Sequence, residues 1–167
     1  TKAYCYFFSE KTDSFSGIKT LYYNVVMEKC KCDVGEYLQD LNEKFARPTE
    51  GFVVNFIHNV LSGIKYLVDK NFFHRDIKLQ NILIYEDKIH GWIFKICDFG
   101  YTREADNTVS HTAGETGTVY FMAPECVGSN ERTPESDIWA LGVCLYYMIM
   151  GDLPFDEDLQ QKDKKIA

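Results

Sequence analysis

The segment 49–68 constrains the fold of this chain more than any other part of the sequence. Its apolar side chains recur every three or four residues, which is the period of an α-helix, and Thr49 stands where an N-cap residue is preferred. Because this apolar stripe is broad, we expect the helix to be largely buried, with other elements packed around it. The apolar positions are Phe52, Val53, Phe56, Ile57, Val60, Leu61, Ile64, Leu67 and Val68.

Upstream of this helix the pattern changes from strand to helix. Residues 4–8 (YCYFF) and 21–28 (LYYNVVME) are rich in aromatic and β-branched side chains, and a loop with Gly and Ser joins them. This pattern predicts two strands in a hairpin-like connection. A short helix is then expected over residues 34–45. Arg47-Pro48 stops it, because the residue before a proline avoids helical dihedral angles.

Downstream of the long helix, two further strands and a second long helix are expected. Short β-prone pieces at residues 81–85 (NILIY) and 92–96 (WIFKI) flank a polar turn. Residues 100–118 lack periodicity and predict a long loop, which in compact domains is usually functional or mobile. Thr133-Pro134 opens a helix in the favoured order of cap and proline. Two strands followed by mostly helix with small strand insertions indicate an α+β fold.

The composition narrows the class of protein. The 167 residues are 46% hydrophobic and 26% charged, which is typical of one globular domain. The net charge of −7 argues against nucleic acid as a principal partner, because phosphate binding needs a basic surface. The longest apolar run, residues 138–150, is too short to cross a bilayer. It predicts a buried helix, and we expect no membrane partner.

The six cysteines indicate a reducing compartment. The sequence has no C-x-x-C pair, and Cys30 and Cys32 have no second pair or histidine nearby to complete a zinc site. We therefore expect reduced thiols and a cytoplasmic or nuclear location, with no targeting segment. The chain begins with Thr1 rather than Met, so we expect the protein's own N-terminus to lie further upstream.

The octapeptide HRDIKLQN at residues 74–81 places a carboxylate, a cation and a neutral oxygen ligand in one short loop. CDFG follows at 97–100, then GTVYFMAPE at 117–125 and SDIWALGV at 136–143. A single short pattern occurs by chance, but four in this order and at these spacings are very hard to obtain by chance. On these residues the chain resembles the eukaryotic protein kinase family, of the serine/threonine type.

The resemblance implies a protein kinase-like fold of the α+β class that is incomplete. Residues 1–28 match the end of the N-lobe strands, residues 29–33 the hinge, and residues 34–167 the C-lobe through its central helix. The glycine-rich loop, the strand lysine with its helix glutamate, and the final C-lobe helices are expected outside this segment. Alone, the segment is expected to transfer phosphate poorly or not at all.

The resemblance also assigns roles in the transfer of phosphate from ATP to protein Ser/Thr hydroxyls. Asp76 matches the catalytic base, and Lys78 matches the cation that contacts the γ-phosphate. Asn81 and Asp98 match the ligands of Mg²⁺, a metal that prefers oxygen donors. Thr118 would hydrogen-bond the catalytic Asp and Lys and would help to shape the acceptor pocket.

The nucleotide site implied by the resemblance uses both backbone and side-chain groups. The adenine would bind the backbone of the hinge, while side chains would contact the ribose, the adenine and the phosphates. The implied positions are Glu28 (carbonyl) and Cys30 (amide) for the adenine, Asp33 for the ribose, Leu83 for the pocket floor, and Lys78 and Asp98 for the phosphates and their metal.

Other motif residues match structural or regulatory positions in the family. His74 and Phe99 match packing residues, and Asp137 matches the residue that braces the backbone of the catalytic loop. Arg75 precedes the catalytic Asp, an arrangement that accompanies activation by a phosphate on the long loop. The candidate acceptors of that phosphate, which are alternatively loop hydroxyls that are never modified, are Ser110, Thr112 and Thr116.

The resemblance bears on the substrate as well. Lys78 and Thr118 match the serine/threonine pattern, whereas tyrosine kinases carry a different catalytic loop. Basophilic kinases often place glutamates where Gln80 and Tyr147 stand, so we expect weak selection for arginine just upstream of the acceptor. The alternative function is a pseudokinase or a truncated kinase that serves as a binding module. The intact catalytic loop favours catalysis, because a binding module needs none of that chemistry.

Overall fold

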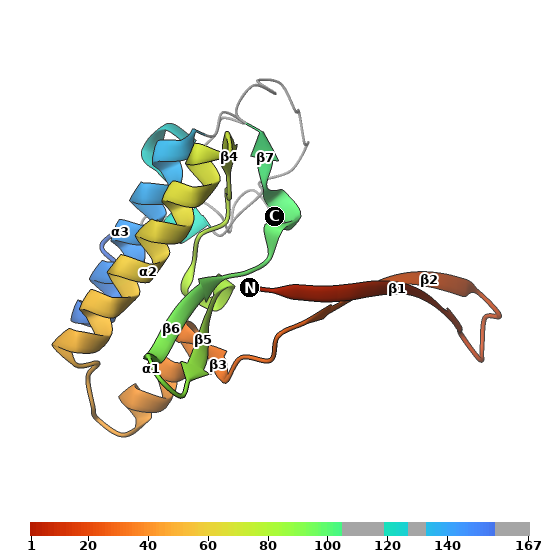
Figure 1. Cartoon of the computed structure of the whole chain (residues 1–167), viewed down its shortest axis with the longest axis horizontal. Helices are drawn as coiled ribbons and strands as arrows, with labels where there is room; N and C mark the ends of the chain where they lie inside the picture. The colour runs from red at the N-terminus through yellow and green to blue at the C-terminus, as the bar shows by residue number, and fades with distance from the viewer. Residues whose placement is uncertain (105–118, 127–132, 156–167) are drawn as a thin grey trace. The chain divides into compact units, whose positions relative to one another are not determined.

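The structure is a computed structural model that describes residues 1–104, 119–126 and 133–155. The chain divides into two compact units, Thr1–Cys30 and Lys31–Ala167. The elements of each unit follow in turn, with the labels of Figure 1.

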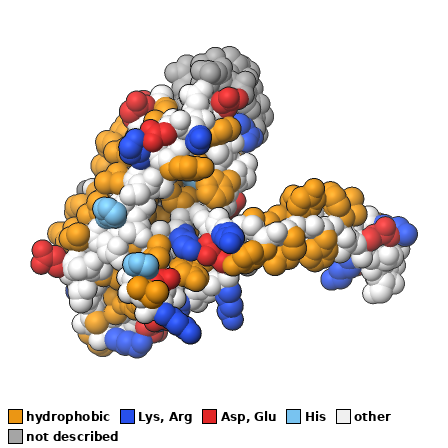
Figure 2. Space-filling model, in the orientation of Figure 1, with side chains coloured by type: hydrophobic (Ala, Val, Ile, Leu, Met, Phe, Trp, Pro, Cys, Tyr) orange, Lys and Arg blue, Asp and Glu red, His pale blue; other side chains and the backbone are white. Residues whose placement is uncertain are grey.

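The first unit is an antiparallel hairpin of β1 (Ala3–Thr12) and β2 (Lys19–Met27). The predicted hairpin is confirmed, although both strands are longer than the pattern indicated and β2 ends one residue before the expected limit. One face carries an aromatic cluster in which the ring of Tyr23 lies 5.4 Å from that of Tyr6 and 5.3 Å from that of Phe8, between centroids. Figure 2 shows hydrophobic side chains gathered along this hairpin, where they are exposed.

The second unit contains a small antiparallel sheet with the strand order β3-β5-β6. The expected strands at 81–85 and 92–96 are confirmed as β5 (Ile82–Asp87) and β6 (Gly91–Ile96). Strand β3 (Cys32–Asp33) was not predicted. A second unpredicted pair joins β4 (Phe72–Phe73) to β7 (Arg103–Glu104). Two-residue strands show no alternation of their own, so periodicity cannot reveal them.

The described residues of the second unit also form three α-helices. The expected helix over 34–45 is α1 (Val34–Glu43), which ends two residues early, and Phe45 beyond it has a left-handed φ of 55°. Thr49 caps α2 (Glu50–Asp69) as predicted, since its hydroxyl accepts from the amide of Phe52. Thr133 is the N-cap residue of α3 (Pro134–Met150).

Helix α2 packs on one side against β6 and α3, as Figure 1 shows. Its residues Phe52, Phe56, Val60 and Ile64 are buried, and they join the core with residues of the sheet and of α3. The expectation that α2 is largely buried is wrong, because the flank of the stripe that includes Leu61 and Val68 stays exposed. Within the described part of the chain, α2 alone is long and apolar enough to span a membrane, and core helices meet the same criterion.

Two asparagines of α2 bind the outer edge of the sheet. Asn59 Oδ1 accepts from the backbone amide of Phe94 at 3.0 Å, and Asn55 Nδ2 donates to the backbone carbonyl of Trp92. The two side chains are joined by a hydrogen bond of 2.8 Å between Asn59 Nδ2 and Asn55 Oδ1. The edge of β6 is thereby supplied with partners that a free edge strand lacks.

Candidate active site

The loop between β4 and β5 is anchored by an aspartate side chain of α3. The carboxylate of Asp137 accepts the backbone amide of His74 at 2.6 Å through Oδ2 and that of Arg75 at 2.9 Å through Oδ1. Asp137 is only 2% exposed, and a buried carboxylate needs such donors to offset its lost hydration. Arg75 itself has a left-handed φ of 73°. The expected bracing role of Asp137 is therefore seen directly in these contacts.

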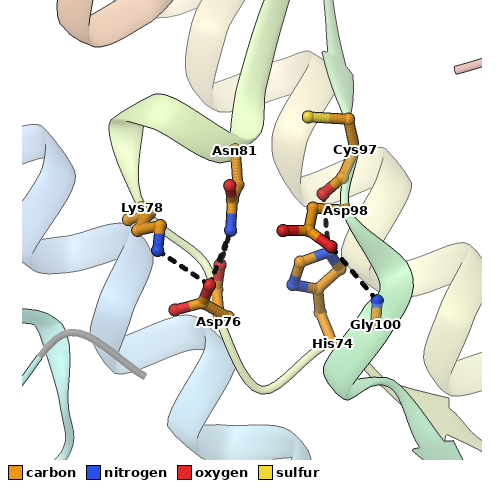
Figure 3. Close-up of polar contacts among 7 residues, drawn as sticks. All are labelled: His74, Asp76, Lys78, Asn81, Cys97, Asp98 and Gly100. Carbon is orange, nitrogen blue, oxygen red and sulfur yellow. Dashed lines mark hydrogen bonds and ion pairs between the residues drawn. The ribbon is translucent and has the colours of Figure 1, made fainter. Parts of the chain in front are cut away.

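Asp76, Lys78 and Asn81 meet at one carboxylate oxygen, as Figure 3 shows. Lys78 Nζ lies 2.9 Å from Asp76 Oδ2, and Asn81 Nδ2 donates to the same oxygen at 2.8 Å. Asn81 Nδ2 also donates to the backbone carbonyl of Asp76 at 2.8 Å. Both side-chain donors thus fix Oδ2, which leaves Oδ1 as the oxygen that can accept from a substrate hydroxyl. Asp76 is 5% exposed, so these contacts act with little screening by water.

Asp98 follows β6 and faces Asn81 in Figure 3. It has a left-handed conformation (φ 61°), and its Oδ1 accepts from the amide of Gly100 at 3.3 Å. The amide of Cys97 donates to the carbonyl of Asn81 at 2.9 Å, which ties the DFG segment to the catalytic loop. His74 Nε2 donates to the carbonyl of Cys97 at 3.0 Å, so both the amide and the carbonyl of Cys97 are hydrogen-bonded to residues of the catalytic loop.

The side chains of Asn81 and Asp98 fit the chemistry of Mg²⁺. Because Asn81 uses its Nδ2 on Asp76, its amide oxygen remains as a donor to a metal. Asp98 adds a carboxylate, and Mg²⁺ commonly takes one or two protein carboxylates or oxygens, with water and phosphate completing its shell. Among the described residues no group of three His, Cys, Asp or Glu side chains forms a metal cage. Asn81 and Asp98 would therefore supply two oxygen ligands to a Mg²⁺ ion.

His74 and Phe99 pack against each other, as expected for packing residues. His74 is fully buried, and the two rings meet edge to face with centroids 5.2 Å apart. Phe99 is nonetheless 45% exposed, so only part of its ring is covered by described residues.

Asp33 and Leu83 are neighbours across the β3–β5 pair. The carboxylate of Asp33 also has a structural role, which was not predicted from the sequence. Its Oδ1 accepts the amide of Glu36 at 2.9 Å, and Glu36 Oε2 accepts the amide of Asp33 at 3.4 Å. These two bonds form a capping box at the start of α1. The carboxylate expected at the ribose thus caps a helix.

Glu28 and Cys30 belong to the first unit, whereas the other described site residues belong to the second. The amide of Glu28 donates to the carbonyl of Lys2 at 2.9 Å, and Glu28 Oε1 accepts from the amide of Lys2 at 2.6 Å. Glu28 therefore closes the open end of the hairpin. The remaining expected site residue, Thr118, and the candidate phosphate acceptors lie outside the described residues; those acceptors are Ser110, Thr112 and Thr116.

The strand pairing adds one residue that sequence reasoning missed. Arg103 in β7 is paired with Phe73 in β4, and Arg75 lies over the Phe73 ring with 5.9 Å between its Cζ and the ring centroid. The Nη1 of Arg103 donates to the carbonyl of Thr102 at 2.8 Å. Arg75 thus packs on the residue whose strand position pairs with Arg103, and only a knowledge of the β4–β7 pair could have connected the two arginines.

A protein kinase domain model matches residues 8–167 of this chain. The chain belongs to the protein kinase family. The mixed helices and strands of the second unit agree with this family, and the predicted α+β class is confirmed.

Curated protein kinases are similar to most of this chain. The MAP kinase kinase skh1/pek1 of Schizosaccharomyces pombe is 36% identical over 133 residues, which cover 79% of this chain and 35% of the relative. The MAP kinase kinase MKK1/SSP32 of Saccharomyces cerevisiae is 38% identical over 116 residues, or 70% of this chain and 22% of the relative. Serine/threonine-protein kinase CLA4 of Eremothecium gossypii is 36% identical over 107 residues, or 64% and 13%. The chain spans about a third or less of the length of these relatives.

Proposed function

We propose that this chain carries the catalytic loop of a serine/threonine protein kinase, which transfers the γ-phosphate of ATP to Ser/Thr hydroxyls of proteins. The observation that supports it best is the shared contact of Lys78 and Asn81 with Asp76 Oδ2. This arrangement orients one carboxylate, places a cation beside it and leaves its second oxygen for a hydroxyl. The similar curated proteins named as serine/threonine kinases support the same acceptor class.

In this function Asp76 Oδ1 accepts the hydrogen bond of the substrate hydroxyl and takes its proton. The hydroxyl oxygen forms a bond to the γ-phosphorus of ATP, while the bond from that phosphorus to the β,γ-bridging oxygen breaks and ADP leaves. Lys78 stabilises the negative charge on the transferring phosphoryl group, since its ammonium is fixed by the carboxylate beside it. Asn81 and Asp98 would hold Mg²⁺, which supplies neutralisation of the phosphate charges. Positioning and electrostatic stabilisation are the main demands of phosphoryl transfer, and this loop meets both.

The two structural units support the proposed division of the chain. Residues 1–28 are proposed as N-lobe strands, 29–33 as the hinge and 34–167 as C-lobe, and the boundary between the units falls inside that hinge. The sequence contains no G-x-G-x-x-G segment, so we propose that the loop over the ATP phosphates comes from elsewhere in the full-length protein. On this proposal the 167 residues alone transfer phosphate poorly.

The proposal is tested by Asp76→Asn in the full-length protein, assayed with MgATP and a degenerate serine/threonine peptide library. We expect the rate of phosphoryl transfer to fall by about 10²–10⁴-fold, because the amide cannot accept the proton. The dissociation constant for MgATP should change little. Asp69→Asn on the exposed side of α2 is the matched control and should retain full activity. Wild-type activity in Asp76→Asn would refute the assignment of the base.

A further inference from the structure

Gly35 lies in the first turn of α1, at the point where this helix touches the catalytic loop. A Cβ atom at this position would lie 3.0 Å from Asp33 Oδ1 and 3.3 Å from Gln80 Nε2. The Cδ of Gln80 would be 3.5 Å away. Since folded proteins are packed to ordinary van der Waals distances, a side chain at residue 35 would displace at least one of these neighbours.

The backbone conformation does not require glycine here. Gly35 is absent from the glycines with positive φ, which are Gly17, Gly91 and Gly151. A glycine inside a helix is less stable than alanine, so this residue lowers helix stability without a conformational reason. Gly51 holds the same position in the first turn of α2, and a Cβ there would meet no atom within 4 Å. Close approach is therefore what distinguishes Gly35.

The two neighbours of Gly35 differ in their freedom to move. Asp33 is held by the capping box with Glu36 and by its place in β3. Gln80 is exposed and belongs to the 3₁₀ turn Leu79–Asn81, so its amide is the group that would yield. Gln80 directly precedes Asn81, whose side chain fixes the catalytic carboxylate.

We propose that Gly35 is a positioning residue that seats Gln80 on the first turn of α1 and so keeps Asp33 and Asn81 in register. This inference rests on the proposed kinase function, in which Asp33 contacts the ribose and Asn81 holds the metal at the other end of the same nucleotide. These residues come from segments far apart in the chain. The 3₁₀ turn that carries Gln80 and Asn81 contacts α1, the helix that Asp33 caps.

The kinetic test is Gly35→Ala in the full-length protein. We expect the KM for MgATP to rise by about threefold or more and kcat to fall as well, because a displaced Gln80 shifts Asn81, which is proposed to hold the metal and which fixes the carboxylate of Asp76. The double variant Gly35→Ala/Gln80→Ala should move KM back toward that of Gln80→Ala alone, since the shorter side chain removes the contacts with Gln80 and leaves the methyl group only the contact with Asp33 Oδ1. Gly51→Ala is the matched control and should leave KM unchanged.

Thermal unfolding of the same variants provides a second readout. Gly51→Ala should raise Tm, as a helical Gly→Ala change does where space is free. Gly35→Ala should raise Tm less than Gly51→Ala does, or should lower it. Part of this difference in Tm should be recovered when Gln80 is also replaced by alanine. Non-additivity between residues 35 and 80 is the signature of their contact.

The outcomes separate this inference from the proposed function. An active wild type with an unchanged KM in Gly35→Ala would overturn the inference, and so would a KM as high in the double variant as in Gly35→Ala. A wild-type protein that phosphorylates no peptide contradicts the proposed function instead. In that case the MgATP dissociation constants and the Tm values of wild type, Gly35→Ala, Gln80→Ala and the double variant still decide whether Gly35 acts through Gln80.

Discussion

The guanidinium of Arg47, in the connection between α1 and α2, lies against Gly151 at the C-terminal end of α3. A Cβ at Gly151 would be 3.1 Å from the Arg47 Cζ and closer still to Nη1. Gly151 also has a left-handed φ of 81°, and its amide donates to the carbonyl of Tyr147 at 2.8 Å. The end of α3 is therefore shaped by a residue that precedes it by more than a hundred positions.

Gly151→Ala should destabilise the protein for two reasons. The left-handed conformation costs about 1–2 kcal/mol for a residue with a Cβ, and the methyl group would also displace Arg47. The measurement is the free energy of unfolding in urea, with Gly142→Ala as control because a Cβ there meets no atom within 4 Å. Adding Arg47→Ala should recover part of the loss. Equal stability of the two Gly→Ala variants would contradict this account.

Replacing Asp137 with alanine should lower both stability and catalysis. The change leaves the buried amides of His74 and Arg75 without their acceptor, which should cost about 2–4 kcal/mol of unfolding free energy. Urea unfolding measures the cost, and Asp152→Ala on the exposed surface is the control. A loss below that of the control would show that the loop does not depend on Asp137.

Asn59→Ala should weaken the outer edge of the sheet. The amide of Phe94 would lose the side-chain oxygen that now accepts its hydrogen bond, with an expected loss of about 1–2 kcal/mol. Hydrogen exchange at the Phe94 amide should be faster in the variant than in the wild type, whereas exchange at Ile84 on the central strand β5 should change less. Asn42→Ala in the exposed part of α1 serves as the control and should leave exchange at Phe94 unchanged.

The buried thiol of Cys144 should make stability fall at alkaline pH. Burial raises the pKa of Cys144 from 9.0 to about 12, whereas the unfolded thiol ionises near its ordinary value. Unfolding then releases a proton between these two values, so the free energy of unfolding decreases as pH rises from 9 to 12. Urea titrations of wild type and Cys144→Ala should differ in this slope. Parallel pH profiles would show that Cys144 ionises equally in both states.

The weak expected selection for arginine can be tested through Gln80. In the full-length protein, Gln80→Glu adds a carboxylate near that of Asp33, and we expect it to raise the preference for arginine just upstream of the acceptor. The measurement is a positional peptide-library screen of wild type and variant. A dominant arginine preference in the wild type would show that Gln80 and Tyr147 do not set this selectivity.

Local patterns predicted the elements of this fold better than their surroundings. The spacing of Phe52, Phe56, Val60 and Ile64 located α2 and its buried face. It could not show that Leu61 on the flank stays exposed, because periodicity does not reveal how far neighbouring elements wrap around a helix.

The short strands and the long-range contacts were less accessible. Strands β4 and β7 are defined by their pairing with each other, and a strand of two residues has no periodic sequence pattern. The roles of Asp76 and Asn81 were expected from the family motif. The motif could not show that Lys78 and Asn81 contact the same oxygen, Asp76 Oδ2, because that depends on the three-dimensional arrangement of the loop. The capping box at Asp33 was readable in principle from Glu36 three positions later.

Asn81 has one further consequence for the way the site responds to ligands. Its carbonyl accepts from Cys97, beside Asp98, while its side chain holds the carboxylate of Asp76. The hydrogen bonds of this one residue therefore link the DFG segment to the carboxylate of Asp76. On the proposed function, a compound that moves the Cys97–Asp98 segment away from Asn81 would misalign the carboxylate of Asp76 without touching it.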